Sequence, residues 1–451
     1  MSIYKDCDIR GIYGKELFPE NAYEIGRGLA AMAPSDQPFL VGGDVRVSTP
    51  ALKKELIRGL TDSGARVWDL GMIPTPVLYF ALSRNPGACG ATVTASHNPP
   101  EHNGVKFMIG GKPVTRETID RLKGIVESKS YPDRKGIAEP ADALSGYFSH
   151  LLARFHAKKP LSVVVDAGNG AMSGIAPKAL RSAGYRVTEL FCEADGRFPN
   201  RSPNPAEYEN LSALCETVLK ARADFGVAFD GDGDRAVFVD NRGRAVINEK
   251  SLSLFIRHIL KDRPTPVVYD QKSSSVIRKA ILASGGTPVP ERSGHAFIKR
   301  RFLEVGAAVA GEVSGHFFFG ELGYDDGLFA ALSMAEILCG SEKSLAELAD
   351  EIVCPPITPD IRLFCPYSEQ DDWLARVKAL ANAFPCSVTE LDGVRLEMES
   401  GWFLIRKSVT AEQVTLRAEA ETPEKLREIL KTVASVLPAS ARESLLKNIP
   451  E

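Results

Sequence analysis

The sequence lacks most features that would place the protein in a membrane or outside the cell. Its eight cysteines are scattered through 451 residues without a CxxC pair, so neither a disulfide framework nor a zinc or thiol-redox motif is expected. No uninterrupted apolar stretch approaches the roughly 20 residues that a membrane span needs. The opening residues carry Lys5, Asp6, Asp8 and Arg10 and no apolar core, which argues against a secretory signal.

The sequence also has little excess charge of either sign. Lysine and arginine number 55 against 58 aspartate and glutamate residues, which gives a net charge of −3. We therefore expect no nucleic-acid partner and no membrane partner, and any anionic ligand must be bound by a local cluster. With 44% hydrophobic and 25% charged residues, the composition is that of a globular protein. At ~150 residues per domain the length predicts about three domains, and the cysteine usage predicts a cytoplasmic location.

One pattern occurs three times along the chain. An apolar, β-rich run ends in Asp, a loop of small residues and a helical stretch follow, and glycine precedes a second strand. The copies begin with FLVGGD at 39–44, LSVVVD at 161–166 and TPVVYD at 265–270. The glycines are Gly64, Gly184 and the Gly285–Gly286 pair, and the second strands open at Val67, Val187 and Val289. Each copy is typical of a βαβ unit, so we expect three similar α/β domains with mixed or mainly parallel sheets.

The last part of the chain has a different pattern. A proline-rich linker begins near Cys354, and alternating strands flank a turn at Asp392–Gly393. A final helix is predicted with Thr422 as its N-cap and Pro423 at its first position. We therefore expect a smaller α+β domain at the C-terminal end. The predicted domains are 1–140, 141–246 and 247–354, each α/β, and 355–451, which is α+β.

The first polar loop with predicted chemistry is TASHNPP at 94–100. Its two prolines exclude a continuing helix, so Ser96 is expected on a sharp, exposed turn. An Asn-Pro turn whose hydroxyl caps its own backbone would also explain the pattern. A serine hydrolase is disfavoured, because Ser96 lacks a GxSxG elbow and the adjacent His97 is poorly placed as its base. A functional Ser96 would carry phosphate, and Lys106 would supply a cation on the returning strand unless it is only a solvated charge.

The second loop is DGDGDR at 230–235, between the predicted strands FGVAF and AVFVD. Three carboxylates at alternate positions, separated by glycines, can direct their oxygens at one hard cation. An EF-hand is disfavoured, because its sixth position would be Arg235 and its flanks are strands. Magnesium fits better, since it takes few protein ligands and completes its shell with phosphate or water. Arg235 is suited to bind a phosphate oxygen.

The third loop is GEVSGH at 311–316, after another apolar run. Glu312 and Ser314 lie at positions i and i+2, so they share one face if the segment is extended. There they could accept and donate hydrogen bonds to vicinal sugar hydroxyls. A plain strand-to-loop turn explains the pattern equally well.

In this order, TASHNP, DGDGDR and GEVSGH resemble the signatures of the α-D-phosphohexomutase superfamily, in its bacterial and archaeal phosphomannomutase/phosphoglucomutase branch. The resemblance spans nearly the whole chain. CDIRG at 7–11 is similar to the family's opening YDIRG, with Cys7 in place of Tyr, and GGDVRVS, GMIPTP, DAGNGA and DGRFPN also match. The resemblance implies three topologically similar α/β domains plus a smaller fourth domain around a central cleft.

The resemblance also implies an activity. It is the interconversion of hexose 1-phosphate and hexose 6-phosphate, of mannose or glucose, through a phosphoserine and a hexose 1,6-bisphosphate intermediate. Ser96 would be the phosphoserine, and Mg²⁺ would be held by its phosphate with Asp230, Asp232 and Asp234. Around the transferring phosphoryl group the matching positions are Arg10, His97, Lys106 and His316, with Lys106 or His316 as candidates for moving the hydroxyl proton. On the substrate side the matching positions are Arg235, Lys272, His295, Glu312 and Ser314.

The chain departs from this family in its last domain. The usual phosphate loop has the sequence RxSGTEP or RxSNTEP, but here it is RKSVTAE at 406–412. The β-branched Val409 replaces a residue that tolerates positive φ, so loop amides are less able to wrap an anion. We therefore expect the phosphate that is not transferred to be bound mainly by the side chains of Arg406, Ser408, Thr410 and Arg417.

Two alternatives stay open from the sequence. One is a phosphoglucosamine mutase, whose serine loop more often has the sequence SASHNP. The other is a non-catalytic sugar-phosphate-binding or regulatory relative. The intact serine and the three aspartates argue against the second alternative.

Overall fold

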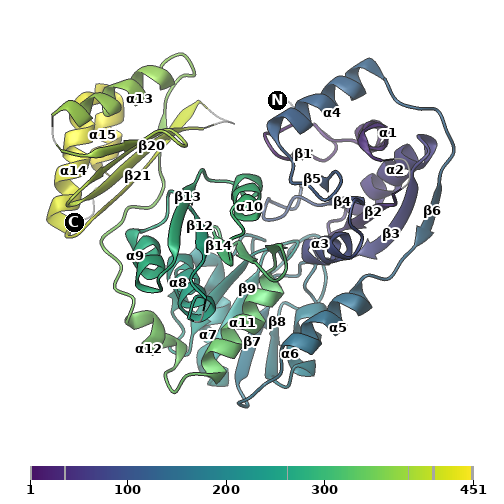
Figure 1. Ribbon diagram of the computed structural model, residues 1–451, viewed down its shortest axis with the longest axis horizontal. Helices are drawn as coiled ribbons and strands as arrows, with labels where there is room; N and C mark the ends of the chain where they lie inside the picture. The colour runs from purple at the N-terminus through teal and green to yellow at the C-terminus, as the bar shows by residue number, and fades with distance from the viewer. Residues whose placement is uncertain (1–2, 35–36, 262, 384, 409–411, 448–451) are drawn as a thin grey trace.

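The computed structural model describes residues 3–34, 37–261, 263–383, 385–408 and 412–447. Over these residues the chain forms four β-sheets, which we call sheets I to IV in chain order. Figure 1 shows the helices packed around each sheet, with sheet IV and its helices set apart from the rest of the molecule. No helix within the described ranges is long and apolar enough to span a membrane.

Sheet I contains six strands and is built from the first part of the chain. Its strands are β1 (Ile9–Ile12), β2 (Phe39–Gly43), β3 (Arg66–Met72), β4 (Cys89–Val93), β5 (His102–Met108) and β6 (Ile137–Pro140). Its helices are α1 (Pro19–Met32), α2 (Thr49–Asp62), α3 (Thr75–Arg84) and α4 (Arg116–Ser128).

Sheets II and III contain five strands each. The elements of sheet II are α5 (Leu144–Arg154), β7 (Ser162–Asp166), α6 (Ile175–Ser182), β8 (Arg186–Leu190), η1 (Tyr208–Leu211), α7 (Ser212–Ala221), β9 (Phe225–Phe229), β10 (Ala236–Asp240) and β11 (Ala245–Val246). Those of sheet III are α8 (Asn248–Ile259), β12 (Pro266–Asp270), α9 (Ser275–Ala283), β13 (Thr287–Glu291), α10 (His295–Glu304), β14 (Val309–Gly311), β15 (Phe317–Phe319), β16 (Tyr324–Asp325), α11 (Gly327–Cys339) and α12 (Leu345–Asp350).

The predicted threefold repeat is present in the strand order. In sheet I, β2 pairs in parallel with β3 and β4, and β4 pairs antiparallel with β5. In sheet II, β7 pairs in parallel with β8 and β9, and β9 pairs antiparallel with β10. In sheet III, β12 pairs in parallel with β13 and β14, and β14 pairs antiparallel with β15. The mixed α/β architecture is therefore confirmed, with parallel and antiparallel pairs equal in number in sheets II and III.

The repeated Asp and Gly have local physical reasons. At the end of the first strand of each copy, an Asp carboxylate accepts a hydrogen bond from the backbone N–H two residues later, at 2.8–2.9 Å: Asp44 from Arg46, Asp166 from Gly168, Asp270 from Lys272. These Asx turns start the loop that follows each strand. The glycines have positive φ, at 89° for Gly64, 101° for Gly184 and 73° for Gly285, as the passage from helix to strand requires.

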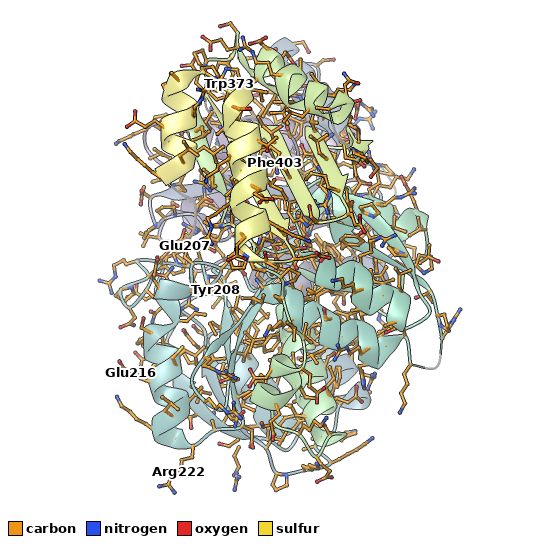
Figure 2. The ribbon with its side chains drawn as sticks, turned by 90° about the vertical axis from the view of Figure 1, so that its left-hand side faces the viewer. Glu207, Tyr208, Glu216, Arg222, Trp373 and Phe403 are labelled. Carbon is orange, nitrogen blue, oxygen red and sulfur yellow. The ribbon has the colours of Figure 1, made fainter. Side chains whose placement is uncertain are left out.

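Sheet IV is antiparallel and has its own hydrophobic core. Figure 2 shows α13 and α14 beside this sheet, and Trp373 and Phe403 are both buried in the core. The predicted N-cap is confirmed, because Thr422 accepts from the backbone N–H of Lys425. The prediction that this helix is the last one is wrong, since α15 follows it. The elements are β17 (Ile361–Phe364), α13 (Gln370–Ala379), η2 (Leu380–Asn382), β18 (Ser387–Thr389), β19 (Val394–Met398), β20 (Gly401–Lys407), β21 (Gln413–Ala420), α14 (Pro423–Val436) and α15 (Ala439–Lys447).

The three polar loops occupy equivalent places in the fold. The serine loop joins β4 to β5, the aspartate loop joins β9 to β10, and GEVSGH joins β14 to β15. Each loop therefore connects two antiparallel neighbours of its sheet. Backbone contacts link two of these loops, since Ala236 N donates to Gly315 O and Arg235 forms a β-bridge with His316. The repeat thus brings three chemically different loops to one region.

Candidate active site

A cavity of about 620 Å³ lies where the loops of sheets I, II and III meet. Figure 1 shows α10 on the side of sheet III that faces β1 and β5. Residues from all three elements line the cavity. Tyr367, in the segment between β17 and α13, also lines the cavity. The predicted site residues that line the cavity are Arg10, Ser96, His97, Lys106, Arg235, His295 and His316.

Ser96 is on a sharp turn, but the prediction that this turn is exposed is wrong. The residue is 1% exposed and has a φ of 51°, which a non-glycine residue adopts at a cost. Its Oγ donates to Asp230 Oδ2 at 2.7 Å, and its N–H donates to Thr94 Oγ1 at 2.9 Å. The hydroxyl of the first loop therefore points directly at the acidic group of the second.

Arg46, which was not among the predicted site residues, binds the backbone of the serine loop. Its guanidinium is fully buried and donates to the carbonyl oxygens of Ser96 at 2.8 Å and of Asn98 at 2.6 Å. Asp44 fixes the guanidinium through Arg46 Nε at 3.1 Å. The sequence signal for Arg46 is Asp44, which ends the first repeated strand, because this carboxylate accepts a hydrogen bond from the residue two positions later.

His97 and Arg10 complete the wall beside Ser96. His97 Nδ1 lies 3.4 Å from Ser96 Oγ, although its position next to Ser96 in the sequence predicted a poor placement as a base. Burial, and then the positive charges of Arg235 and Arg10, hold the pKa of His97 well below its usual value, so the ring is neutral. Arg10 donates to Asn98 Oδ1 at 3.0 Å and to Asp8 Oδ2 at 2.7 Å. These contacts place a cation and a neutral imidazole next to the hydroxyl.

The aspartate loop forms a buried, acidic centre. One carboxylate oxygen from each of Asp230, Asp232 and Asp234 lies within 4.8 Å of the others, and all three side chains are fully buried. Among the described residues, Asp232 Oδ1 and Asp234 Oδ1 have no hydrogen-bond partner. Burial, and then the charges of its two neighbours, raises the pKa of Asp230 to about 8. Buried carboxylate oxygens this close together, two of them unsatisfied, fit a hard cation.

Lys106 is bound to the acidic centre rather than solvated, so the interpretation as a free surface charge is wrong. Its side chain is 16% exposed, and Nζ donates to Asp232 Oδ2 at 2.8 Å and to Asp234 Oδ2 at 2.6 Å. Burial alone would lower the pKa of Lys106, but the charges of Asp232 and Asp234 outweigh it and raise the pKa above its usual value. Lys106 is therefore a stable ammonium in this arrangement.

His316 is oriented by a carboxylate that the sequence analysis did not single out. Asp325, fully buried on β16, lies 2.9 Å from His316 Nδ1 and 2.8 Å from His295 Nε2. Arg235 Nε donates to His316 Nε2 at 3.0 Å, so Nε2 is an acceptor and the proton lies on Nδ1, toward Asp325. Because Asp325 belongs to no motif, only the pairing of β15 with β16 shows that it is close to the site.

Glu312 and Ser314 are together, but on a turn instead of an extended segment. Ser314 Oγ donates to Glu312 Oε2 at 2.9 Å, and Gly315 N donates to Glu312 O at 3.1 Å. Gly294 N donates to Glu312 Oε1 at 2.9 Å, which ties the turn to the start of α10. The pair does not line the cavity described above.

Three other predicted cations lie outside that cavity, and each is paired with a carboxylate near sheet IV. Lys272 Nζ lies 3.0 Å from Asp360, Arg406 Nε 3.3 Å from Asp392, and Arg417 Nη2 3.2 Å from Glu249. Ser408 N donates to Gln413 O at 2.9 Å and closes the base of the loop between β20 and β21. Thr410, with Val409, lies outside the described residues.

Comparisons with known proteins point to one family. Models described as phosphoglucomutase/phosphomannomutase, alpha/beta/alpha domains I, II and III match residues 1–133, 145–243 and 248–354. The chain is 39% identical to a phosphomannomutase/phosphoglucomutase of Pseudomonas aeruginosa over 97% of both chains, and 38% identical to a phosphoglucomutase of Neisseria gonorrhoeae over 96% of both. It superposes with a TM-score of 0.91 on a phosphoglucomutase/phosphomannomutase family protein from Burkholderia thailandensis, at 33% identity and 97% coverage of each chain.

Proposed function

Because the chain belongs to the phosphoglucomutase/phosphomannomutase family, we propose that it interconverts hexose 1-phosphate and hexose 6-phosphate, of glucose or mannose, with phosphorylated Ser96 as the donor. The small-molecule sugar phosphate is its partner, and hexose 1,6-bisphosphate is both intermediate and activator. The observation that carries the proposal is the bond from Ser96 Oγ to Asp230, which sets the hydroxyl of one loop against the carboxylates of another.

In the first transfer, a sugar hydroxyl oxygen forms a bond to phosphorus while the bond from phosphorus to Ser96 Oγ breaks. Ser96 Oγ keeps the electron pair and takes up a proton, and the sugar hydroxyl proton passes to a base. His316 is suited to this role, because Asp325 fixes its tautomer and Nε2 is the acceptor. The resulting bisphosphate returns its other phosphoryl group to Ser96, which regenerates the donor and releases the isomeric product.

Asp230, Asp232 and Asp234, with the phosphate on Ser96, would hold Mg²⁺. When bound, the ion offsets phosphate charge and polarises phosphorus for in-line attack. Lys106 contacts two of these carboxylates and lines the same cavity, so it places a further positive charge beside the phosphoryl group. Arg10 and Arg235 are placed to bind phosphate oxygens there.

The remaining predicted residues would bind the sugar and the second phosphate, as their match to the family positions implies. Glu312, Ser314, His295 and Lys272 would bind the sugar, and Arg406, Ser408, Thr410 and Arg417 would bind the phosphate that is not transferred. Arg406 lies on β20, Ser408 directly follows this strand, and Arg417 lies on β21. The proposed domains keep the boundaries 1–140, 141–246, 247–354 and 355–451.

The decisive experiment compares wild type with Ser96→Ala. Glucose, mannose and glucosamine 1-phosphates are assayed with Mg²⁺ and a trace of glucose 1,6-bisphosphate, and intact mass is measured for a phosphate on the wild type. We expect turnover of glucose or mannose 1-phosphate by the wild type and none by Ser96→Ala, with an unchanged melting temperature.

Ser128→Ala, on the exposed surface of α4, is the matched control and should behave as wild type. Substantial mutase activity in purified Ser96→Ala would contradict the phosphoserine role. A preference for glucosamine 1-phosphate would favour a phosphoglucosamine mutase, a name borne by a relative at 35% identity from Methanothermobacter thermautotrophicus. Binding without turnover in the wild type would favour a non-catalytic relative.

A further inference from the structure

Lys299 is a buried lysine in the cavity that none of the roles above uses. It lies on α10, is 3% exposed, and lines the cavity together with Ser96, Lys106 and His295. Its ammonium sits 3.4 Å from the centre of the Tyr79 ring. Its hydrogen-bond acceptor is the thioether of Met108 at 3.8 Å, which is a weak one.

Other cations that line the cavity are paired with carboxylates. Lys106 contacts Asp232 and Asp234, Arg10 contacts Asp8, and Arg116 contacts Asp6. Among the described residues, no carboxylate lies within 4.0 Å of the Lys299 ammonium. A buried charge without a partner lowers the stability of the folded protein. We therefore expect such a charge where a ligand supplies the counter-charge.

The contacts of the Lys299 ammonium supply no counter-charge. They are made by the Tyr79 ring from α3 and by Met108 from β5, both of which are uncharged. Asp325, Asp234 and Lys106 act on it only at longer range, and burial lowers its pKa to about 8. A cation–π contact offsets part of the desolvation, but it leaves the ammonium's N–H donors without a strong acceptor.

We propose that Lys299 is a phosphate-binding residue, whose ammonium pairs with an anionic oxygen of the substrate's phosphoryl group when a phosphate monoester enters the cavity. The assignment of the anion as a sugar phosphate rests on the proposed function. The observation of a buried ammonium without a carboxylate partner does not depend on that function. A phosphate oxygen supplies both the counter-charge and the acceptor that the chain withholds.

The test replaces Lys299 by methionine, which keeps the length of the side chain and suits the contacts with Tyr79 and Met108. Binding is measured calorimetrically in full-length chains that also carry Ser96→Ala, so that no transfer disturbs the equilibrium. The probes are glucose 1-phosphate, inorganic phosphate and glucose. The control is Arg301→Met, two positions along α10, whose guanidinium pairs with Glu304 at the surface.

We expect Lys299→Met to weaken both phosphate probes by roughly 10- to 100-fold and to leave any binding of glucose unchanged, since a charge-assisted hydrogen bond is lost. The melting temperature should stay equal or rise, because an unpaired charge leaves the interior. Arg301→Met should bind like its parent.

An unchanged Kd for glucose 1-phosphate and inorganic phosphate in Lys299→Met would overturn the inference, and a lower melting temperature with unchanged Kd would show a purely structural lysine. The proposed function is tested separately by turnover in the chain with an intact Ser96. A wild type without mutase activity would refute that function, whereas an active wild type with an indifferent Lys299→Met refutes the inference alone.

Discussion

At the scale of single residues, the site depends on how each buried charge is compensated. Asp232 illustrates this, because its Oδ2 accepts from Lys106 at 2.8 Å and from Thr75 at 2.7 Å, while Oδ1 has no partner among the described residues. Burial would raise the pKa of Asp232, but the contact with Lys106 holds it below the usual value. Asp232 is therefore a carboxylate with one oxygen held by the chain and one available to a cation.

Asp232→Asn should weaken Mg²⁺ binding by roughly tenfold or more and lower turnover accordingly, because the variant loses one full negative charge and keeps the size of the side chain. The measurement is activity against Mg²⁺ concentration, together with direct calorimetry. Glu216→Gln, a similar loss of charge on the outer surface of α7 (Figure 2), is the control and should not change either curve. Undiminished turnover of the wild type after exhaustive chelation would contradict a metal role for this loop.

At the scale of elements, the start of α11 couples a helix to the site. Asp326 is fully buried and caps the helix, accepting from the N–H groups of Leu328 and Phe329 at 2.9 Å each. Tyr147 on α5 donates to its other oxygen at 2.8 Å. Asp325, which orients both histidines, is the residue just before it. The cap thus fixes the chain direction at the point where β16 ends and the helix begins.

Asp326→Asn should make unfolding less dependent on pH. Burial raises the pKa of Asp326 to about 7, well above the value of an unfolded Asp, so the folded state binds more protons than the unfolded state between about pH 4 and 7. Its contribution to stability is complete below pH 4 and is lost as the pH rises through 7. Asparagine keeps the capping acceptor and cannot titrate, so at pH 8 the variant should be more stable, on the order of 2 kcal/mol.

The measurement for Asp326 is urea unfolding of both proteins from pH 5 to pH 8, where the two stability curves should diverge as the pH rises. Asp142→Asn, an exposed residue near the start of α5, serves as the control and should follow the wild type. Parallel curves for wild type and Asp326→Asn would mean that Asp326 is ionised throughout this range in the folded protein.

At the scale of the whole molecule, three sheets with the same repeated strand pairing place three loops around a cavity, whereas sheet IV has its own hydrophobic core and carries Arg406 and Arg417. Gln271 Nε2 donates to Asp392 O at 2.8 Å and Ser275 N to Glu419 at 3.0 Å, so sheets III and IV are joined by polar contacts. The cations near this junction are paired with carboxylates. If they bind the phosphate that is not transferred, as proposed above, that phosphate replaces the carboxylates as their partner.

Arg406→Ala should raise the KM for glucose 1-phosphate by roughly 10- to 100-fold, because a charged hydrogen bond to the phosphate that is not transferred is lost. Both half-reactions should suffer, with a smaller effect on phosphoserine formation. Starting from glucose 1-phosphate, the phosphate that is not transferred is the one on C1 before the intermediate reorients and the one on C6 after it. Steady-state kinetics and phosphorylation of Ser96 by glucose 1,6-bisphosphate separate the two effects.

Lys407→Ala is the control for Arg406, because neighbouring residues on β20 point to opposite faces and Lys407 pairs with Asp371. It should leave the KM unchanged. A chain ending near Cys354 that kept normal affinity for hexose 1-phosphate would show that sheet IV does not bind this phosphate.

The sequence by itself determined the features that depend on local physics. The Asp that ends a strand, the glycine that turns from helix to strand, the Thr422 cap and the hairpin positions of the three loops are set by residues a few positions apart. For this reason the repeat, the α/β class and the acidic centre could be predicted.

Only the tertiary structure decided which distant groups meet. Asp325 contacts two histidines, and Lys299 faces Tyr79 on α3, a helix from another part of the chain. Neither contact has a signal in the local sequence, and for Arg46 the preceding Asp44 does not reveal its contacts with the serine loop. Ser96 is buried instead of exposed for the same reason, since loops from other parts of the chain cover its turn. Burial and charge compensation depend on the sum of contacts from distant segments, so they are set by how the sheets pack together.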